Sequence, residues 1–328
     1  MKQLRPALVP LAAGRPTPSR APAGRSLRLG LLAAVFVAPP EVSRAAAQLP
    51  DERATARLRY LGTSGWYVET AAGSLVIDYV GVDAAGASVG PRMTPLPPRD
   101  VRRGPTIVIA THEHDDHFSP SVRSWADSLP GSLFAAGGSV PIRAGDVRLE
   151  PRRALRVGPA QLWTIRSTDE GVGVLARLGG VTIFHAGDHA RWNEASDSAY
   201  RAEIDFLAAL GVVVDIAFLP IVTGSRCGAT ESIRAGALHA IDRLRPRVAV
   251  PMHVRCADQL VTLYSAFADS AAGRGALVVA PRAIGEEFDY DGEALTRRAP
   301  SDGRADDREI VGRACHAMAD VATCGPTP

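Results

Sequence analysis

Residues 111–120 read THEHDDHFSP and directly follow a short apolar run, TIVIA, at residues 106–110. Such a short, almost wholly apolar run is typical of a strand that is buried on both faces. Ser119 and Pro120 predict the start of a helix, which we expect to extend to about Ser128. The polar segment therefore joins a buried strand to a helix, and such connections often carry functional residues.

This segment contains four side chains of the types that bind metal ions. They are His112, His114, Asp116 and His117. In an extended chain His112 and His114 point the same way, because residues two apart share one face. Neutral imidazoles and a carboxylate suit zinc or a similar divalent ion. A solvated polar loop is the alternative, but four residues of ligand type within six positions favour a metal site.

The rest of the chain predicts a layered α/β fold. Residues 51–80 predict short antiparallel strands with glycine turns, and residues 172–178 and 181–185 predict a hairpin around Gly179-Gly180. The sequence then predicts, in order, a helix at 194–210, a strand at 213–219, a helix at 230–244, a strand at 247–251, a helix at 258–271 and a last strand at 276–280. Buried strands flanked by helices indicate layers of sheet and helix.

The first 47 residues have the features of an export signal. Arg25 and Arg28 precede an apolar run of ten residues at 29–38, and Ala45-Ala46-Ala47 offers a cleavage site. Ten apolar residues are too few to span a bilayer, which needs about 20. We therefore expect a signal peptide or extension at 1–47, a folded domain at 48–292 and a polar tail with one short helix at 293–328. The mature protein would be secreted or periplasmic; a disordered extension or a membrane anchor is the alternative.

Charge and cysteines narrow the class of protein further. The net charge is +2, and no long basic run follows the first 30 residues, which argues against a nucleic-acid partner. The four cysteines are Cys227, Cys256, Cys315 and Cys324. An even number in an exported chain permits disulfides. We expect Cys227 to pair with Cys256; Cys315 could pair with Cys324 only if the tail helix breaks, and four reduced thiols are the alternative.

The pattern H-x-H-x-D-H after an apolar strand resembles the signature of the metallo-β-lactamase superfamily. Three further segments are similar to that family: YLGTSGWYVETAAGSLVIDY at 60–79, IFHAGDHARWN at 183–193 and VAVPMHV at 248–254. The resemblance covers about residues 58–255 and implies an α/β fold, a four-layer αβ/βα sandwich with metal ions between two sheets. It is closest to a branch of uncharacterised hydrolases that also holds lactonases.

The resemblance also implies a set of metal ligands. His112 and His114 would bind metal 1, while Asp116, His117 and His253 would bind metal 2 and Asp188 would bridge the two. We expect two divalent ions, with zinc first and manganese or iron as alternatives, to supply a hydroxide from a shared water. With Asp116 and Asp188 as the catalytic carboxylates, the protein would hydrolyse an ester, lactone, amide or phosphodiester bond of a small molecule. The alternative is a non-catalytic or degenerate metal-binding member of the fold.

One departure from the family pattern concerns metal 1. Relatives usually supply a third histidine between the signature and the bridging aspartate, but here the only histidine in that interval is His185, in the H-A-G-D segment itself. We expect Asp169 to replace it; Thr168, Glu170, His185 or no ligand at all are the alternatives, and Asp169 also suits a plain turn. A carboxylate is a harder donor than imidazole, which favours manganese or iron.

Two residues near the predicted ligands are candidates for outer roles. Asp78 closes a predicted strand, where family position suggests a carboxylate that orients a ligand histidine; a solvated strand-end aspartate is the alternative. His185 and His189 flank the predicted bridging aspartate, and His189 could face the cleft and act on the substrate or leaving group. The alternative for His189 is an exposed loop histidine.

Two arginines follow predicted strands and could lie at one rim of the site. Arg226 and Arg255 each precede a cysteine. Arginine at a rim can clamp a carboxylate or a phosphate. In a chain so rich in arginine, ordinary surface residues are the alternative.

Overall fold

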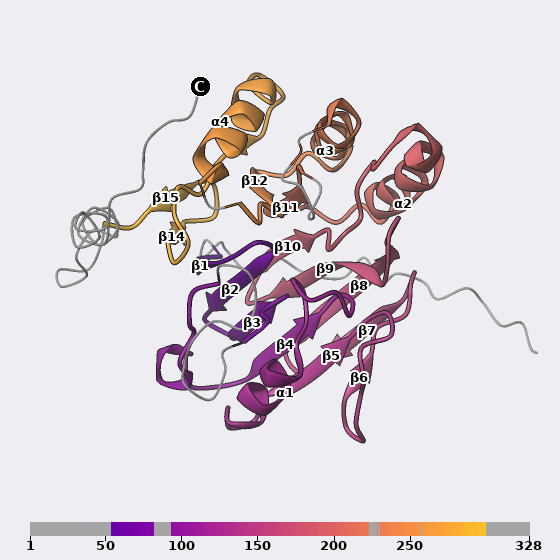
Figure 1. Cartoon of the computed structure of the whole chain (residues 1–328). Coiled ribbons are helices and arrows are strands. Elements are labelled where there is room, and N and C mark those ends of the chain that lie inside the picture. Colours follow the sequence, from indigo (N-terminus) through magenta and orange to yellow (C-terminus); the bar gives the residue numbers. More distant parts are fainter. Residues whose placement is uncertain (1–53, 82–92, 223–227, 229, 257, 300–328) are drawn as a thin grey trace, which may run out of the picture. The chain divides into compact units, whose positions relative to one another are not determined.

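The structure, a computed structural model, describes residues 54–81, 93–222, 228, 230–256 and 258–299. Within these residues two sheets lie face to face (Figure 1). The first sheet has the strand order β15-β14-β1-β2-β3-β4-β5-β6. Its strands are β1 (Ala56–Gly62), β2 (Gly65–Thr70), β3 (Gly73–Ile77), β4 (Thr106–Ala110), β5 (Leu133–Ala136), β6 (Val147–Arg148), β14 (Glu287–Tyr290) and β15 (Leu295–Arg297).

The second sheet has the order β13-β12-β11-β10-β9-β8-β7. Its strands are β7 (Ala154–Val157), β8 (Ala160–Arg166), β9 (Val172–Leu178), β10 (Val181–His185), β11 (Ile216–Pro220), β12 (Val248–Met252) and β13 (Leu277–Val278). The predicted hairpin at 172–185 is confirmed, because β9 and β10 pair antiparallel across the Gly179-Gly180 turn.

Helices cover the outer face of each sheet. They are α1 (Pro120–Asp127), α2 (Asp197–Ala209), α3 (Glu231–Leu244) and α4 (Leu260–Ser270), with short 3₁₀ turns η1 (Pro98–Asp100) and η2 (Glu194–Ser196). Helix α1 contacts β5, whereas α2, α3 and α4 contact strands of the second sheet (Figure 1). The predicted four-layer αβ/βα sandwich is therefore confirmed. No helix in the described part of the chain has the length and apolar character needed to cross a membrane.

Successive apolar side chains along the strands of the first sheet pack into two different cores, one on each face of the sheet. On β2, Trp66 and Val68 belong to the core between the sheets, while Tyr67 belongs to a second core under α1. On β4, Ile107 and Val108 divide in the same way. Successive side chains of a strand point to opposite faces, so an apolar residue at every position gives a strand buried on both faces, as predicted for residues 106–110.

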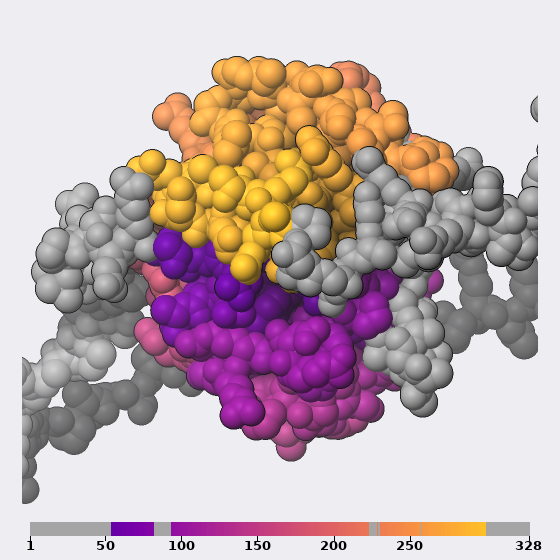
Figure 2. Space-filling view, turned by 90° about the vertical axis from the view of Figure 1, so that its left-hand side faces the viewer, coloured from indigo at the N-terminus to yellow at the C-terminus, as the bar shows by residue number. Residues whose placement is uncertain are grey.

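The C-terminal strands extend the domain beyond its predicted boundary. Strand β14 pairs antiparallel with β1, and β15 pairs with β14. Figure 2 shows these yellow strands packed beside the indigo N-terminal strands. The predictions that the last strand lies at 276–280 and that the tail begins at 293 are therefore wrong, because Leu295–Arg297 belongs to the first sheet. The short tail helix predicted beyond residue 299 lies outside the described residues.

The carboxyl ends of parallel strands meet at one edge of the sandwich. In the first sheet β3 and β4 are parallel, and in the second β10, β11 and β12 are parallel. Residues that follow such strands meet at the same edge of a sheet, which is where α/β folds place their ligands. The polar segments that follow these strands in both sheets lie at this edge, and they contain the predicted metal ligands.

Candidate metal centre

The predicted ligands come from three strand ends and one turn. The 112–117 segment follows β4, Asp188 follows β10, His253 follows β12, and Asp169 lies in the turn between β8 and β9. The side chains of His112, His117, Asp188 and His253 are almost completely buried, although His114 and Asp169 are exposed. Two sheets thus contribute donors to one cluster, and neither sheet holds the whole set.

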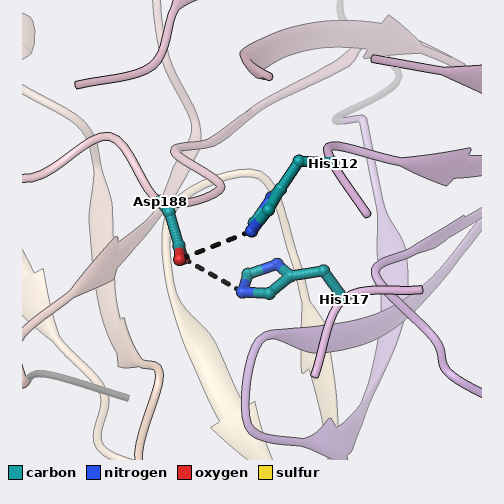
Figure 3. A group of neighbouring side chains, drawn as sticks. All are labelled: His112, His117 and Asp188. Carbon is teal, nitrogen blue, oxygen red and sulfur yellow. Dashed lines mark ion pairs between the residues drawn. The ribbon is translucent and has the colours of Figure 1, made fainter. Parts of the chain in front are cut away.

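Asp188 lies at the centre of this cluster. Its Oδ2 is 3.5 Å from His112 Nε2, and its Oδ1 is 3.0 Å from His117 Nε2 and 3.1 Å from His253 Nε2. Figure 3 shows the Asp188 carboxylate directed at the rings of both His112 and His117. Asp116 Oδ2 adds a further donor, 3.5 Å from His253 Nε2 and 3.8 Å from His117 Nε2. The two oxygens of Asp188 therefore face two different sets of donors.

The donors on the His112 side include the two exposed side chains. His114 Nδ1 lies 3.0 Å from His112 Nε2 and 3.9 Å from Asp169 Oδ2. Glu170 is also near, with Oε2 3.5 Å from His114 Nε2, but its other oxygen accepts a hydrogen bond from Ser139. His114, Asp169 and Asp188 form one group of donors close enough to share an ion. The structure therefore brings Asp169 to the side of the cluster where a third donor is lacking.

The carboxylate of Asp78 fixes the orientation of two ligand histidines, His117 directly and His112 through Thr111. It accepts hydrogen bonds from Thr111 N at 2.8 Å, Thr111 Oγ1 at 2.9 Å and His117 Nδ1 at 2.7 Å. Thr111 Oγ1 is in turn 3.0 Å from His112 Nδ1. With His112 Nδ1–H donating to Thr111 and His117 Nδ1–H donating to Asp78, both Nε2 atoms keep a lone pair for a metal ion.

The backbone around His253 is held in an unusual conformation. His253 has φ of +78°, and Asp78 and Thr63 also have positive φ values of +50° and +48°. The amide of His253 donates to the Thr63 carbonyl at 2.8 Å, and its Nδ1 donates to the Val222 carbonyl at 2.9 Å. Left-handed backbone in non-glycine residues persists where the surroundings fix it, and it is common at functional sites.

Burial and charge act against each other on the pKa values in this cluster. Burial lowers the pKa of His253, but Asp188 and Asp116 outweigh it and raise that pKa to about 10. Burial also opposes a charged His117, yet Asp188 and Asp78 raise its pKa well above the usual value. In the other direction, burial raises the pKa of Asp188, but His117 and His253 lower it well below the usual range. A negative field that favours protons on imidazoles also favours a divalent cation.

The donor set fits divalent ions. Asp116 Oδ2, His117 Nε2 and Asp188 Oδ1 are buried with no hydrogen-bond partner among the described residues. Buried polar atoms without partners are rare and indicate a missing ion or water. Two donors of a tetrahedral zinc ion lie roughly 3.4 Å apart, given bonds of about 2.1 Å, and the distances around Asp188 are of this size. Imidazole and carboxylate are also the chemistry that such ions prefer.

Comparison with known proteins places this cluster in a family. The sequence matches the beta-lactamase superfamily domain over residues 57–253, which includes every predicted ligand. The chain belongs to this superfamily.

Relatives within the superfamily support a hydrolase. A protein named metal-dependent hydrolase from Thermus thermophilus is 28% identical over 238 residues, covering 66% of this chain and 92% of the relative. Another so named from Symbiobacterium thermophilum is 26% identical, covering 67% and 93%. A solved metallo hydrolase from Ignicoccus hospitalis is 19% identical, with a TM-score of 0.49 and coverage of 72% and 98%. The names of the two sequence relatives confirm, at this level, the prediction of a metal-dependent hydrolase of this superfamily.

A pocket of about 500 Å³ opens over the donors. It is lined by His114, Asp115, Asp116, Asp169, Asp188, Trp192, His253 and Arg255. Five of these eight residues are predicted ligands, with Asp169 counted among them. Arg255, which was predicted to lie at the rim of the site, is also present. A small molecule that entered this pocket would therefore lie directly against the donor cluster.

The structure places the two flanking histidines away from the pocket. His185 is buried, with Nε2 donating to the Ser64 carbonyl at 2.8 Å and Nδ1 accepting from Gly187 N at 3.2 Å, so both ring nitrogens are used. His189 is buried as well, and its ring stacks on Tyr200 with centroids 4.7 Å apart. Both interpretations of His189, a residue that faces the cleft and an exposed loop histidine, are therefore wrong, because the ring of Tyr200 on helix α2 covers it.

Of the remaining predicted residues, the structure describes Thr168 and Cys256 but not Arg226 or the other cysteines. The Thr168 hydroxyl donates a hydrogen bond to the Ala190 carbonyl at 2.6 Å. Thr168 therefore holds this loop in place and is not a metal ligand of the cluster. Arg226 and Cys227 lie outside the described residues, as do Cys315 and Cys324. Cys256 is disulfide-bonded, and its pairing with Cys227 stays a prediction.

Three residues at the site were not predicted from the sequence. Thr111 links Asp78 to His112, Trp192 lines the pocket with its ring centroid 5.9 Å from that of His253, and Asp115 contacts Arg255. Thr111 and Asp115 lie within the THEHDDHFSP segment, so their position beside the ligands was an available signal. Trp192 also lies within a segment that resembles the family, at 183–193, but its residue type did not indicate a role at the site.

Close backbone packing explains the glycines around Thr111. Gly171 has φ of +68°, and a Cβ atom there would overlap the Thr111 carbonyl oxygen. Gly187 has φ of +56° and lies against both Val172 and Thr111. These two positions allow the turns from the second sheet to approach the segment that carries the histidines.

Proposed function

We propose that the protein hydrolyses an ester, lactone, amide or phosphodiester bond of a small molecule at a pair of divalent ions held between its two sheets. The position of Asp188 carries this proposal, because its two oxygens face separate sets of nitrogen donors. A single carboxylate shared by two donor sets supports two adjacent ions rather than one.

The chain's own residues have distinct tasks in this scheme. His112, His114, Asp188 and Asp169 would hold the first ion, and Asp116, His117, His253 and Asp188 the second. When bound, such ions, with zinc first and manganese or iron as alternatives, supply a nucleophilic hydroxide at neutral pH and stabilise developing negative charge. Asp78 and the Val222 carbonyl hold protons at Nδ1 of His117 and His253, which keeps each Nε2 available.

The alternative is a non-catalytic metal-binding member of the superfamily. The missing third histidine was the feature that favoured it. Asp169 lies 3.9 Å from His114 and shares a donor group with Asp188, which supports a complete first site. We therefore favour the enzyme.

Metal content and hydrolysis together test the proposal. Protein purified after growth with added zinc should contain about two ions per chain, and it should hydrolyse at least one member of a panel of esters, lactones, amides and phosphodiesters. Asp116→Ala and His117→Ala should abolish hydrolysis while the proteins remain folded. Less than half an ion per chain would contradict the metal site, and two ions without any hydrolysis would favour the non-catalytic alternative.

We further propose that the mature protein is secreted or periplasmic, after cleavage near Ala47. The basic and apolar pattern of residues 25–47 supports export, and the disulfide at Cys256 supports an oxidising compartment. Amino-terminal sequencing of the protein from its native host tests this. An intact amino terminus on the cytoplasmic protein would contradict it.

A further inference from the structure

Arg255 lies in the wall of the pocket, two residues after the ligand His253. Its side chain is only 25% exposed, so its guanidinium is held against the protein. One terminal nitrogen lies 3.3 Å from each carboxylate oxygen of Asp115. The other lies 3.8 Å from Asp116 Oδ1. The guanidinium therefore sits beside the donor cluster and already contacts a carboxylate.

The charges of the lining residues single out Arg255. Among the described residues that line the pocket, it is the one with a permanent positive charge, and the aspartates are Asp115, Asp116, Asp169 and Asp188. Two divalent ions would balance these four carboxylates, and Arg255 would balance the hydroxide of the proposed mechanism. The attraction for an anion is therefore local to the guanidinium, whose planar fork matches a carboxylate.

Asp115 differs from the other aspartates in its exposure. Its side chain is 78% exposed, whereas the side chain of Asp116 is 5% exposed. An exposed ion pair contributes little stability, because water screens it and the side chains lose freedom to form it. Asp115 can therefore leave Arg255 at small cost, and the carboxylate of an incoming molecule can take its place.

We propose that Arg255 binds a carboxylate group of the substrate and that Asp115 occupies the guanidinium until the substrate enters. This inference rests on the proposed hydrolase function and narrows it to small molecules that carry a carboxylate near the scissile bond. Arg255 is then the residue that sets specificity, and Asp115 competes with the substrate for it.

The experiment compares two esters that differ in one charge. The zinc-loaded protein is assayed with p-nitrophenyl butyrate and with the mono-p-nitrophenyl ester of glutaric acid, and the ratio of the two kcat/KM values is the readout. Arg255→Gln should lower the ratio of anionic to neutral ester by roughly 10-fold to 100-fold, the range of one hydrogen bond between charged groups. Arg57→Gln, which removes an exposed arginine paired with Asp289 on β14, is the matched control and should leave the ratio unchanged.

Asp115→Asn makes the opposite prediction. It should raise the ratio in the wild-type background, because the guanidinium loses its internal partner. In the Arg255→Gln background the same change should have much less effect, since there is no guanidinium to release. An increase of equal size in both backgrounds would mean that Asp115 acts only through its general charge and would overturn the competition.

Calorimetry gives a readout that does not need hydrolysis. Glutarate titrated into the zinc-loaded protein should bind more weakly to the Arg255→Gln variant by the same factor. If no member of the panel of esters, lactones, amides and phosphodiesters is hydrolysed but glutarate binding depends on Arg255, the proposed function fails and the binding inference stands. If both esters lose activity equally and zinc binds less tightly, Arg255 positions Asp116 instead and the inference is overturned. A larger dependence of inorganic phosphate than of glutarate on Arg255 would overturn the choice of a carboxylate.

Discussion

Replacing Asp78 with asparagine should weaken metal binding without breaking the fold. Asp78 is fully buried and accepts three hydrogen bonds, two from Thr111 and one from His117 Nδ1 at 2.7 Å. Asparagine suits the backbone because it tolerates the positive φ of +50° at this position. Its amide, however, has only one acceptor oxygen, and its NH₂ group would oppose the donors of Thr111 or His117.

The magnitude follows from what His117 loses. If the asparagine NH₂ faces Nδ1, the ring must carry its proton on Nε2, which removes the lone pair that a metal ion needs. Loss of such an outer partner typically costs 10-fold to 100-fold in metal affinity. The lost hydrogen bond between charged groups should also lower the free energy of unfolding by about 1.5–3 kcal/mol.

Zinc titration in competition with a chelator measures the affinity, and urea denaturation of the metal-free protein measures the stability. Asp289→Asn is the control, because that side chain is 55% exposed on β14 and should change neither quantity. Two ions bound to Asp78→Asn with wild-type affinity would refute the reasoning that Asp78 sets the proton position on His117.

Three further changes test other parts of the site. Asp169→Ala should reduce the metal content to about one ion per chain, and Asp169→His should tighten zinc binding; full occupancy of Asp169→Ala in elemental analysis would show that Asp169 is no ligand. Gly171→Ala should lower the free energy of unfolding by more than about 1 kcal/mol, because alanine disfavours the positive φ and would overlap the Thr111 carbonyl, and an unchanged denaturation midpoint would contradict this. Mass spectrometry of the non-reduced protein should find Cys227 linked to Cys256, and a free thiol at Cys227 would exclude that pair.

Local sequence signals predicted the elements whose causes are local. The hairpin of β9 and β10 was predicted at its observed bounds because Gly179-Gly180 supplies the turn and the strands are mostly apolar. Helix α1 begins one residue after Ser119, as expected, yet that serine's hydroxyl donates to the Val80 carbonyl instead of capping the helix. The sequence thus predicted where the helix begins, but it did not predict the contact of the Ser119 hydroxyl.

Strands with distant partners gave no such signal. Strand β14 reads EFDY and β15 reads LTR, and neither run is long or apolar enough to be recognised alone. Their stability comes from β1, which lies at the other end of the domain. Sequence reasoning therefore placed the end of the domain too early.

The site shows the same division between motif and tertiary contact. The spacing of His112, His114, Asp116 and His117 predicted a cluster of donors, and the structure brings these residues together with Asp188 and His253. What the spacing could not provide is the packing of α2, which places Tyr200 against His189. Whether a histidine faces a cleft or a neighbouring ring depends on an element that the local sequence does not contain.

The pairing of β1 with β14 also sets the order in which the domain can be completed. Ala56 pairs with Tyr290, so the partner strand leaves the ribosome roughly 10–50 s after β1, at about 5–20 residues per second. Until then one edge of β1 has no partner, and unpaired strand edges promote association between chains. If the protein is exported, as we propose, this delay would assist translocation, because the first sheet cannot be completed until the last strands have been made.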